Sequence, residues 1–454
     1  MSSKIKHILI ANEAEAFAKI IGTIPDKKTR VARINFENYL ANRSLFWEGD
    51  NKIIITSCLI DPVLLKAANH RFGIKNIVNL CPSKIKMNLS NSILQDRNLL
   101  GKLKKTIREN PFIRISPYAY TKDFQILITE LRKSKLSFYV DQEPTSGNYE
   151  IVQHLDSKIG FRTEVSALQA MGQKIFSPKF FICKTKAGAK AAATTFYKNG
   201  LSCVIKASLG EGGWGLLVLQ KYSYKSTFSL EKYIGAQFAK DSIWKTGSIV
   251  VEEFVASSNT RADSPSLEFF LDDSGPRITY ICNQLLSQSG AFLGVLIGKS
   301  SVIPKIKSEV NCVGLIIARR YWELGYRGFF DIDFVISKSG VIFPIETNAR
   351  RTGGTHVFDL TQKIFGKNWE EKTLSLSSDS FKYGEEVLPA ETILKKNSPI
   401  SFPMNGRKKG VVITIIDSQR PVFGFIIFAP TQGEILRIHE KLTGLWNRDI
   451  VTPL

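Results

Sequence analysis

The sequence predicts an α/β domain at the N-terminus, a larger α+β region after it and a small β-rich module at the C-terminus. Three observations in the 454 residues support this fold class. Apolar strands alternate with helical patterns over the first 150 residues, a lysine and a glycine-rich loop separate two apolar strands near residue 210, and an acidic hairpin lies near residue 340. At about 100–200 residues per domain, this length fits two or three domains.

The first domain, residues 1–145, has the pattern of a Rossmann-like fold. Its predicted strands are residues 6–11, 52–57, 77–80 and 137–140. Helices such as 123–132 lie between them, and this alternation favours a parallel sheet. No glycine fingerprint follows the first strand, so we expect a scaffolding or acceptor-substrate role and no dinucleotide bound in the usual way. The polar, turn-forming residues 141–148 are the predicted linker.

Residues 204–219, Val-Ile-Lys-Ala-Ser-Leu-Gly-Glu-Gly-Gly-Trp-Gly-Leu-Leu-Val-Leu, predict a strand, a glycine-rich loop and a second strand. The ammonium of Lys206 beside flexible backbone amides suits a polyphosphate. Gly210-x-Gly212-x-x-Gly215 also matches the dinucleotide fingerprint, but that fingerprint must open a helix. A protein-kinase loop is excluded, because in kinases the lysine follows the glycines, whereas Lys206 precedes them here. In addition, no HRD or DFG motif occurs in the sequence. Taken alone, an ordinary glycine-rich hairpin explains this segment equally well.

Residues 328–348 predict a second hairpin, with Ser-Lys-Ser-Gly as its turn. If the last two of these form the turn, Asp333 lies opposite Glu346 and Asp331 lies opposite Asn348. All four side chains then share one face of the hairpin. A four-residue loop would shift the partners by two residues and keep them on that face.

Facing carboxylates this close repel each other unless a cation lies between them, because opposed Cβ atoms are about 4.5–5.5 Å apart. Carboxylate and amide oxygens suit Mg²⁺, which leaves its other positions to water and phosphate. A solvated acidic face is the alternative interpretation. The near-continuous apolar strands and the net charge of +21 favour a metal site.

In order and spacing, Lys206 with its glycine loop, residues 250–255, Asp333 and Glu346-x-Asn348-x-Arg350 resemble the ATP-grasp superfamily. The resemblance covers roughly residues 150–400. It implies an ATP-grasp domain at 150–405, whose subdomains 150–240 and 245–405 clamp ATP, preceded by a pre-ATP-grasp domain. The implied reaction transfers the terminal phosphate to a carboxylate, after which an amine attacks the acyl phosphate.

The resemblance also implies nucleotide contacts. Lys158 and Lys206 would hold the phosphates, residues 208–215 would form the lid, and residues 252–255 would read the adenine. The ribose contact is expected at Ser266 or Glu268. The full expected ATP-binding set is Lys158, Lys206, Ser208, Gly210, Glu211, Gly212, Gly213, Trp214, Gly215, Glu252, Glu253, Phe254, Val255 and Glu268.

For the chemistry, the same resemblance implies that Asp333, Glu346 and Asn348 ligate two Mg²⁺ ions, with Mn²⁺ as an alternative. Arg350 and Lys206 are the expected catalytic residues. Arg350 would steady the transferred phosphoryl group or the acyl phosphate, and Lys206 would neutralise charge during the transfer.

A narrower resemblance is to pheganomycin-type peptide ligases. It rests on residues 348–356 (Asn-Ala-Arg-Arg-Thr-Gly-Gly-Thr-His), on 115–121, and on Asn283-Gln284-Leu-Leu followed by residues 290–294. It implies an amide bond between an amino-acid-like carboxylate and an amine or peptide. The expected substrate-binding residues are Arg350, Arg351, Thr352, Gly353, Gly354 and His356. The arginines offer forked donors and the glycines offer backbone amides to an oxyanion. His356 either handles the acceptor amine or is a structural histidine.

Composition limits the remaining function classes. No apolar run approaches the 18 residues of a membrane span, and residues 1–11 read as a strand and not as a signal peptide, so we expect a cytoplasmic protein. The six cysteines show no metal spacing, and those at 183, 203 and 282 look like core residues. The lysines are dispersed and no nucleic-acid motif accompanies them, so no nucleic-acid partner is expected. The basic charge either attracts anions or is a general surface property.

Residues 406–454 predict the β-rich module, which would cap the active site or carry an oligomer contact such as that of a homodimer. Two other functions stay open. One is a ligase of the same fold with a thiol or phosphate acceptor, and the other is a non-catalytic ATP-binding scaffold. The sequence does not identify the substrates.

Overall fold

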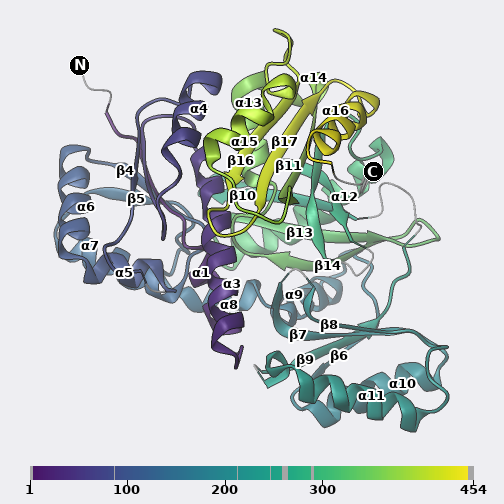
Figure 1. Cartoon of the computed structure of the whole chain (residues 1–454). Helices are drawn as coiled ribbons and strands as arrows, with labels where there is room; N and C mark the ends of the chain where they lie inside the picture. The colour runs from purple at the N-terminus through teal and green to yellow at the C-terminus, as the bar shows by residue number, and fades with distance from the viewer. Residues whose placement is uncertain are drawn as a thin grey trace.

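The computed structural model describes residues 4–447, apart from residues 86, 212, 246, 258–263 and 288–290. Its strands form a five-stranded parallel sheet, a four-stranded sheet and an eight-stranded antiparallel sheet (Figure 1). The predicted mixture of α/β and α+β structure is therefore confirmed, while the predicted domain boundaries stay a prediction. None of the helices in the described ranges has both the length and the apolar composition that a membrane crossing requires.

The N-terminal sheet has the strand order β3-β2-β1-β4-β5, and all of its pairs are parallel. Its strands are β1 (His7–Ile10), β2 (Lys52–Ile55), β3 (Ile77–Leu80), β4 (Ile113–Pro117) and β5 (Phe138–Val140). The predicted alternation is confirmed, although β4 is missing from the predicted set because Arg114 and Ser116 interrupt its apolar residues. The helices here are α1 (Glu13–Ala16), α2 (Ala18–Ile21), α3 (Lys27–Leu40), η1 (Ala41–Phe46), α4 (Pro62–Phe72), α5 (Leu89–Gln95), α6 (Arg97–Glu109) and α7 (Lys122–Lys133).

The four-stranded sheet is antiparallel in the order β6-β9-β7-β8 and carries the lysine–glycine segment. Its strands are β6 (Phe180–Cys183), β7 (Cys203–Glu211), β8 (Trp214–Leu219) and β9 (Ile249–Glu253). The predicted strand–loop–strand unit is thus confirmed as β7 and β8. In Figure 1 this sheet lies at the lower right with two of its helices. The helices of this region are α8 (Tyr149–Leu155), α9 (Lys158–Ala170), α10 (Lys186–Lys198), α11 (Thr227–Lys240) and η2 (Ser242–Lys245).

The large sheet has the order β14-β13-β10-β11-β12-β15-β17-β16. Its strands are β10 (Pro265–Asp272), β11 (Gly275–Leu286), β12 (Phe292–Gly298), β13 (Gly328–Ile336), β14 (Ile342–Asn348), β15 (Leu374–Lys382), β16 (Gly410–Ile416) and β17 (Val422–Ala429). The accompanying helices are α12 (Pro304–Glu323), α13 (Thr355–Phe365), α14 (Trp369–Lys372), α15 (Ala390–Lys396), η3 (Ser398–Ile400) and α16 (Gln432–Leu445). Cys183, Cys203 and Cys282 are buried, as predicted, and all six cysteines are free.

The C-terminal strands β16 and β17 extend the large sheet through β15 and do not form a sheet of their own. All seven residues of β16 are buried. An isolated two-stranded hairpin could not bury both of its faces, and it would be marginally stable in water. The β-rich tail predicted at 406–454 is therefore built into the neighbouring sheet as far as the structure describes it, to residue 447.

The acidic hairpin pairs as predicted, but for a different reason. Asp331 lies opposite Asn348 and Asp333 opposite Glu346. The assumed two-residue turn is wrong, because the strands end with Ile336 paired to Ile342. A β-bulge beside Pro344 then shifts the register by one residue and restores the predicted partners.

Candidate functional site

Most of the predicted site residues line one cavity of about 890 Å³. The four-stranded sheet contributes Lys206, the described glycines of the loop and residues 252–255. The large sheet contributes the acidic hairpin, and the N-terminal region contributes α3. Three parts of the chain that are far apart in sequence therefore build a single site.

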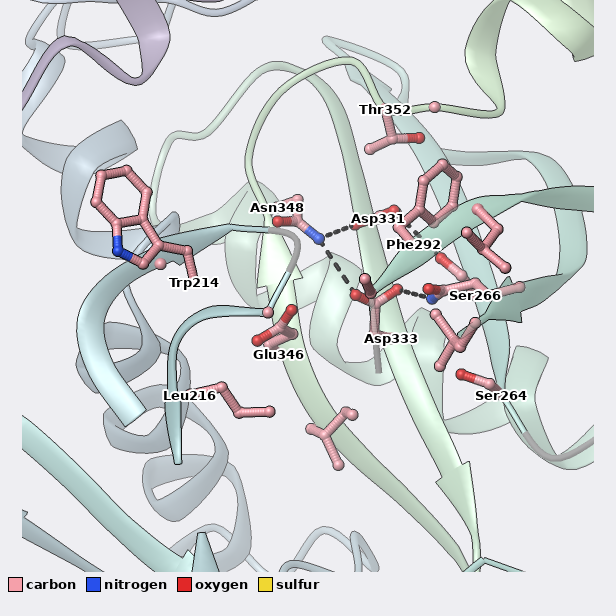
Figure 2. Close-up of a pocket in the computed structure, with 18 of the residues that line it drawn as sticks. Trp214, Leu216, Ser264, Ser266, Phe292, Asp331, Asp333, Glu346, Asn348 and Thr352 are labelled. Carbon is pink, nitrogen blue, oxygen red and sulfur yellow. Dashed lines mark hydrogen bonds between the residues drawn. The ribbon is translucent and has the colours of Figure 1, made fainter. Parts of the chain in front are cut away.

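The acidic side chains of β13 and β14 point toward the same space (Figure 2). The Asn348 amide Nδ2 donates to Asp331 Oδ1 at 2.9 Å and to Asp333 Oδ2 at 3.3 Å. Ser266 Oγ donates to Asp331 Oδ2 at 3.2 Å, and the Gln284 amide donates to Asp333. Gln284 lines the cavity, although no individual role was predicted for it from the sequence.

Burial and mutual repulsion change the proton affinity of this cluster. Burial raises the pKa of Asp331 to about 7. Burial, together with the charges of Asp331 and Glu346, raises the pKa of Asp333 well above its usual value. Burial acts in the same direction on Glu346, but the ammonium groups of Lys158 and Lys206 outweigh it and lower the pKa of that carboxyl group. Negative charge is thus costly at the aspartates, and a cation would offset that cost.

Two lysines approach the cluster from the side of the four-stranded sheet. Lys158 begins α9, and its Nζ lies 3.2 Å from Glu346 Oε2 and 3.2 Å from the Gly210 carbonyl. Lys206 on β7 forms an ion pair with Glu252 of β9. Both lysines line the cavity, as the predicted phosphate contacts require.

Arg162, for which no role was predicted, connects the two sheets next to the cavity, which its partners Glu252 and Ile345 line. Its Nε and Nη2 lie 2.8 and 2.6 Å from Glu252 Oε2. The same guanidinium donates to the Pro344 carbonyl at 3.2 Å and to the Ile345 carbonyl at 3.3 Å. These carbonyls lie at the bulge of β14, next to Glu346. The fully buried Arg162 thus links the strand that pairs with Lys206 to the strand that carries Glu346.

Arg350 and Arg351 occupy different environments. Arg350 Nη1 lies 2.6 Å from Asp156 Oδ1, and Nη2 donates to Asn348 Oδ1 at 2.9 Å. Arg351 is completely buried and forms an ion pair of 2.6 Å with Glu48. Arg350 is therefore coupled directly to the acidic hairpin, whereas Arg351 ties the following loop to the N-terminal region.

The glycines of that loop have a packing role. A Cβ atom on Gly353 would lie 2.7 Å from the Phe292 ring, and one on Gly354 would lie 2.3 Å from the Tyr280 hydroxyl oxygen. Both glycines and Thr352 line the cavity. Small residues are required here whether or not a ligand approaches.

Several predicted site residues do not reach the cavity. Glu268 is fully buried, and Thr352 Oγ1 and Thr279 Oγ1 donate to it at 2.9 and 3.0 Å. This placement argues against the expected ribose contact of Glu268, while Ser266 does line the cavity. His356 is completely buried, with Nε2 3.8 Å from Asp379 Oδ1, which favours its structural interpretation.

The expected ATP-binding set also includes Ser208, Glu211 and Gly212. Ser208 is on β7 but is not among the cavity-lining residues. Gly212 and the side chain of Glu211 lie outside the described part of the chain, and so does Gly290 of the narrower motif.

The residues expected to hold a metal fit a hard cation in their chemistry. Asp333, Glu346 and Asn348 offer oxygen donors at a place where negative charge is costly. Among the described residues, no cluster of three or more His, Cys, Asp and Glu side chains is arranged as a metal site. The third donor of the expected set is an amide, whose oxygen here accepts from Arg350.

Neither a protein-family model nor a curated protein sequence matches the chain. Solved structures do match over nearly its whole length. N5-carboxyaminoimidazole synthase of Aspergillus clavatus, determined with ADP and 5-aminoimidazole ribonucleotide, matches with a TM-score of 0.55 and 10% identity, covering 98% of this chain and 100% of that one.

Two biotin carboxylase structures match to a similar degree. The domain of the Hydrogenobacter thermophilus 2-oxoglutarate carboxylase, determined with MgADP, ADP and bicarbonate, has a TM-score of 0.54 and 10% identity, covering 96% of this chain and 90% of that one. The Campylobacter jejuni biotin carboxylase, in complex with β,γ-ATP, has a TM-score of 0.53 and 13% identity, covering 95% and 89%. The chain therefore has the fold of ATP-grasp ligases. At these identities the likeness shows the fold alone.

Proposed function

We propose that the protein is an ADP-forming carboxylate–amine ligase that makes an amide or peptide bond through an acyl phosphate. The observation that carries this proposal is the convergence of Lys158, Lys206 and Arg350 on Glu346 and its neighbours at one cavity. Cations that surround buried carboxylates are the elements that phosphoryl transfer needs, because its catalysis is mainly positioning and charge stabilisation.

In this proposal the nucleotide lies between the glycine loop and the acidic hairpin. Lys158 and Lys206 bind its phosphates, and residues 252–255, which line the cavity, contact the base. Asp333, Glu346 and Asn348 would hold Mg²⁺, which supplies positive charge against the phosphate oxygens. Rotation of the Asn348 amide would turn its oxygen toward the carboxylates.

The proposed reaction has two steps. A carboxylate oxygen attacks the γ-phosphorus, the bond from that phosphorus to the bridging oxygen breaks, and ADP leaves. An amine nitrogen then attacks the acyl carbon, phosphate leaves, and the nitrogen gives up a proton. Arg350 stabilises the charge of the transferred group, and the glycine loop excludes water that would hydrolyse the intermediate.

A second candidate is carboxylation, with bicarbonate as the carboxylate. It is favoured by the shared fold with two biotin carboxylase structures, one of which was determined with bicarbonate. The pheganomycin-type motif at residues 348–356 favours peptide ligation instead. A thiol or phosphate acceptor would need the same first step.

The test is ADP release by the purified full chain with ATP and Mg²⁺. A panel of amino acids, short peptides and bicarbonate serves as the carboxylate source, and mass spectrometry identifies the products. We expect ADP release that requires both an organic carboxylate and an amine, and an amide product. ADP release with bicarbonate alone would favour carboxylation, and no stimulation by any substrate would refute a ligase.

A further inference from the structure

One stripe of α3 and η1 forms a wall of the cavity that the proposed phosphoryl transfer does not use. Arg33, Phe36, Leu40 and Arg43 all line the cavity. Their spacing of three, four and three residues places them on one face of a helix. The wall therefore presents a guanidinium group at each end and apolar side chains between them.

The two arginines of this wall are held differently. Arg43 is buried, and its three nitrogens donate to the Leu40 carbonyl at 3.1 Å, to Asp379 Oδ2 at 2.9 Å and to Glu13 Oε1 at 3.1 Å. The Arg33 side chain is 25% exposed and forms an ion pair with Glu37. Arg33 is therefore the arginine of this wall that a ligand can reach.

The surroundings of Arg33 are aromatic. Its guanidinium carbon lies 5.4 Å from the centre of the Phe36 ring and 5.9 Å from that of Trp214. Trp214 begins β8 within the glycine-rich segment 208–215, and its indole N–H donates to Asp241 Oδ2 at 2.8 Å. Glu37 and these rings orient the guanidinium, which limits the entropy lost on binding a ligand.

The Arg43 end of the wall lies near β12, because a Cβ on Gly353 would be 2.7 Å from the Phe292 ring and 3.8 Å from Arg43 Nη1. Phe292 and Leu293 line the same cavity as Phe36 and Leu40. Figure 2 shows Phe292 and Thr352 on one side of the acidic cluster and Trp214 on the other. The cavity thus extends from the glycine loop to an apolar region, along a helix that carries an accessible cation.

We propose that this wall binds the second substrate of the ligase, an amino acid or short peptide with an apolar side chain, and that Arg33 pairs with its free carboxylate. The inference rests on the proposed function. An acceptor of this kind carries a carboxylate of its own, which must be kept away from the acyl phosphate while its amine attacks. A guanidinium set apart from the acidic hairpin would hold it there by charge-assisted hydrogen bonds.

The first half of the test measures acyl-phosphate formation without the second substrate. Hydroxylamine serves as a small acceptor, and hydroxamate is measured with each of the common amino acids as the carboxylate. The second half compares L-leucine and L-phenylalanine with their amides as acceptors. We expect the acids to be preferred roughly ten- to a hundredfold in kcat/KM, although an amino-acid amide has the more readily deprotonated amine.

The variant Arg33→Met should lose this preference through a higher KM for the acids, with the hydroxamate rate unchanged. Arg33→Lys keeps the positive charge beside Glu37 and should retain part of the preference for acids. It keeps the proposal testable if Arg33→Met does not fold. Lys28→Met, an exposed lysine on another face of α3, is the matched control and should behave as wild type.

The outcomes separate the two proposals. Hydroxamate formation with equal use of acids and amides, or an unchanged preference in Arg33→Met, would overturn the role of Arg33 alone. Equal losses of hydroxamate and amide formation in Arg33→Lys would also overturn it, because they would place Arg33 in the first step. No hydroxamate with any carboxylate would refute the proposed ligase, and this inference with it.

Discussion

Replacing Arg162 by Met should loosen the connection between the two sheets that carry the site. The fully buried guanidinium makes two contacts with Glu252 and donates to two carbonyls at the β14 bulge. Removing one partner of a buried ion pair costs about 3–5 kcal/mol. Glu252 keeps Lys206 as a partner, so we expect a loss near the lower end, about 3 kcal/mol.

Hydrogen exchange measured by mass spectrometry suits this prediction, because a chain with three sheets need not unfold in one step. A loss of about 3 kcal/mol corresponds to exchange of the β9 amides that is faster by about two orders of magnitude. Lys382→Met is the control. It removes an exposed ion pair with Glu385 and should cost less than about 1 kcal/mol.

A double-mutant cycle adds a second check. Arg162→Met combined with Glu252→Gln should cost less than the sum of the two single changes, because each one removes the other's partner. Protection of β9 that is unchanged in Arg162→Met, or strict additivity in the cycle, would show that Arg162 does not carry the connection.

Three other predictions concern two residues that line the cavity and one buried residue behind it, Glu268. Asp333→Asn should reduce ADP release by about a hundredfold or more without loss of stability, because burial raises the pKa of Asp333 and makes its charge costly; an active variant would contradict the metal assignment. Burial raises the pKa of Glu268 from 4.5 to about 7, so the folded state binds this proton more tightly and loses stability as the pH rises through that window. In urea unfolding at several pH values, the free energy of unfolding should decrease less with rising pH for Glu268→Gln than for wild type. Parallel plots of that free energy against pH would refute this. Gly354→Ala should lower the free energy of unfolding in urea by about 1–3 kcal/mol, because its Cβ would strike a buried tyrosine. Gly433→Ala, whose Cβ would meet nothing within 4 Å, should be neutral. Equal urea midpoints for the two variants would contradict this.

The acidic hairpin shows how far a sequence pattern can be taken. Alternation of apolar and acidic residues was enough to place four polar side chains on one face. Alternation alone could not reveal the bulge near Pro344, which compensates for the longer turn. The proline itself was a signal, since within sheets it is confined to edges, strand starts and bulges.

Contacts between segments that are distant in the sequence could not be predicted from the sequence pattern. Arg162 and Glu252 are 90 residues apart, and the apolar surroundings of a strand or helix do not tell which charge on another element lies opposite. The α3 stripe is different, because the spacing of Arg33, Phe36, Leu40 and Arg43 could be seen in the sequence. The sequence did not show which other part of the chain this stripe faces.

The charges at the cavity explain why these distant contacts matter for the proposed chemistry. Lys158 pairs with Glu346, Lys206 with Glu252 and Arg350 with Asp156. Each cation is thus held in place by a carboxylate, and a buried charge is tolerated only when it is paired. A nucleotide phosphate that enters the cavity would replace the carboxylates that now pair with these cations. It would not meet unpaired cations. Binding would therefore depend on how easily Glu252 and Glu346 transfer to other partners, and Arg162 is already in contact with Glu252.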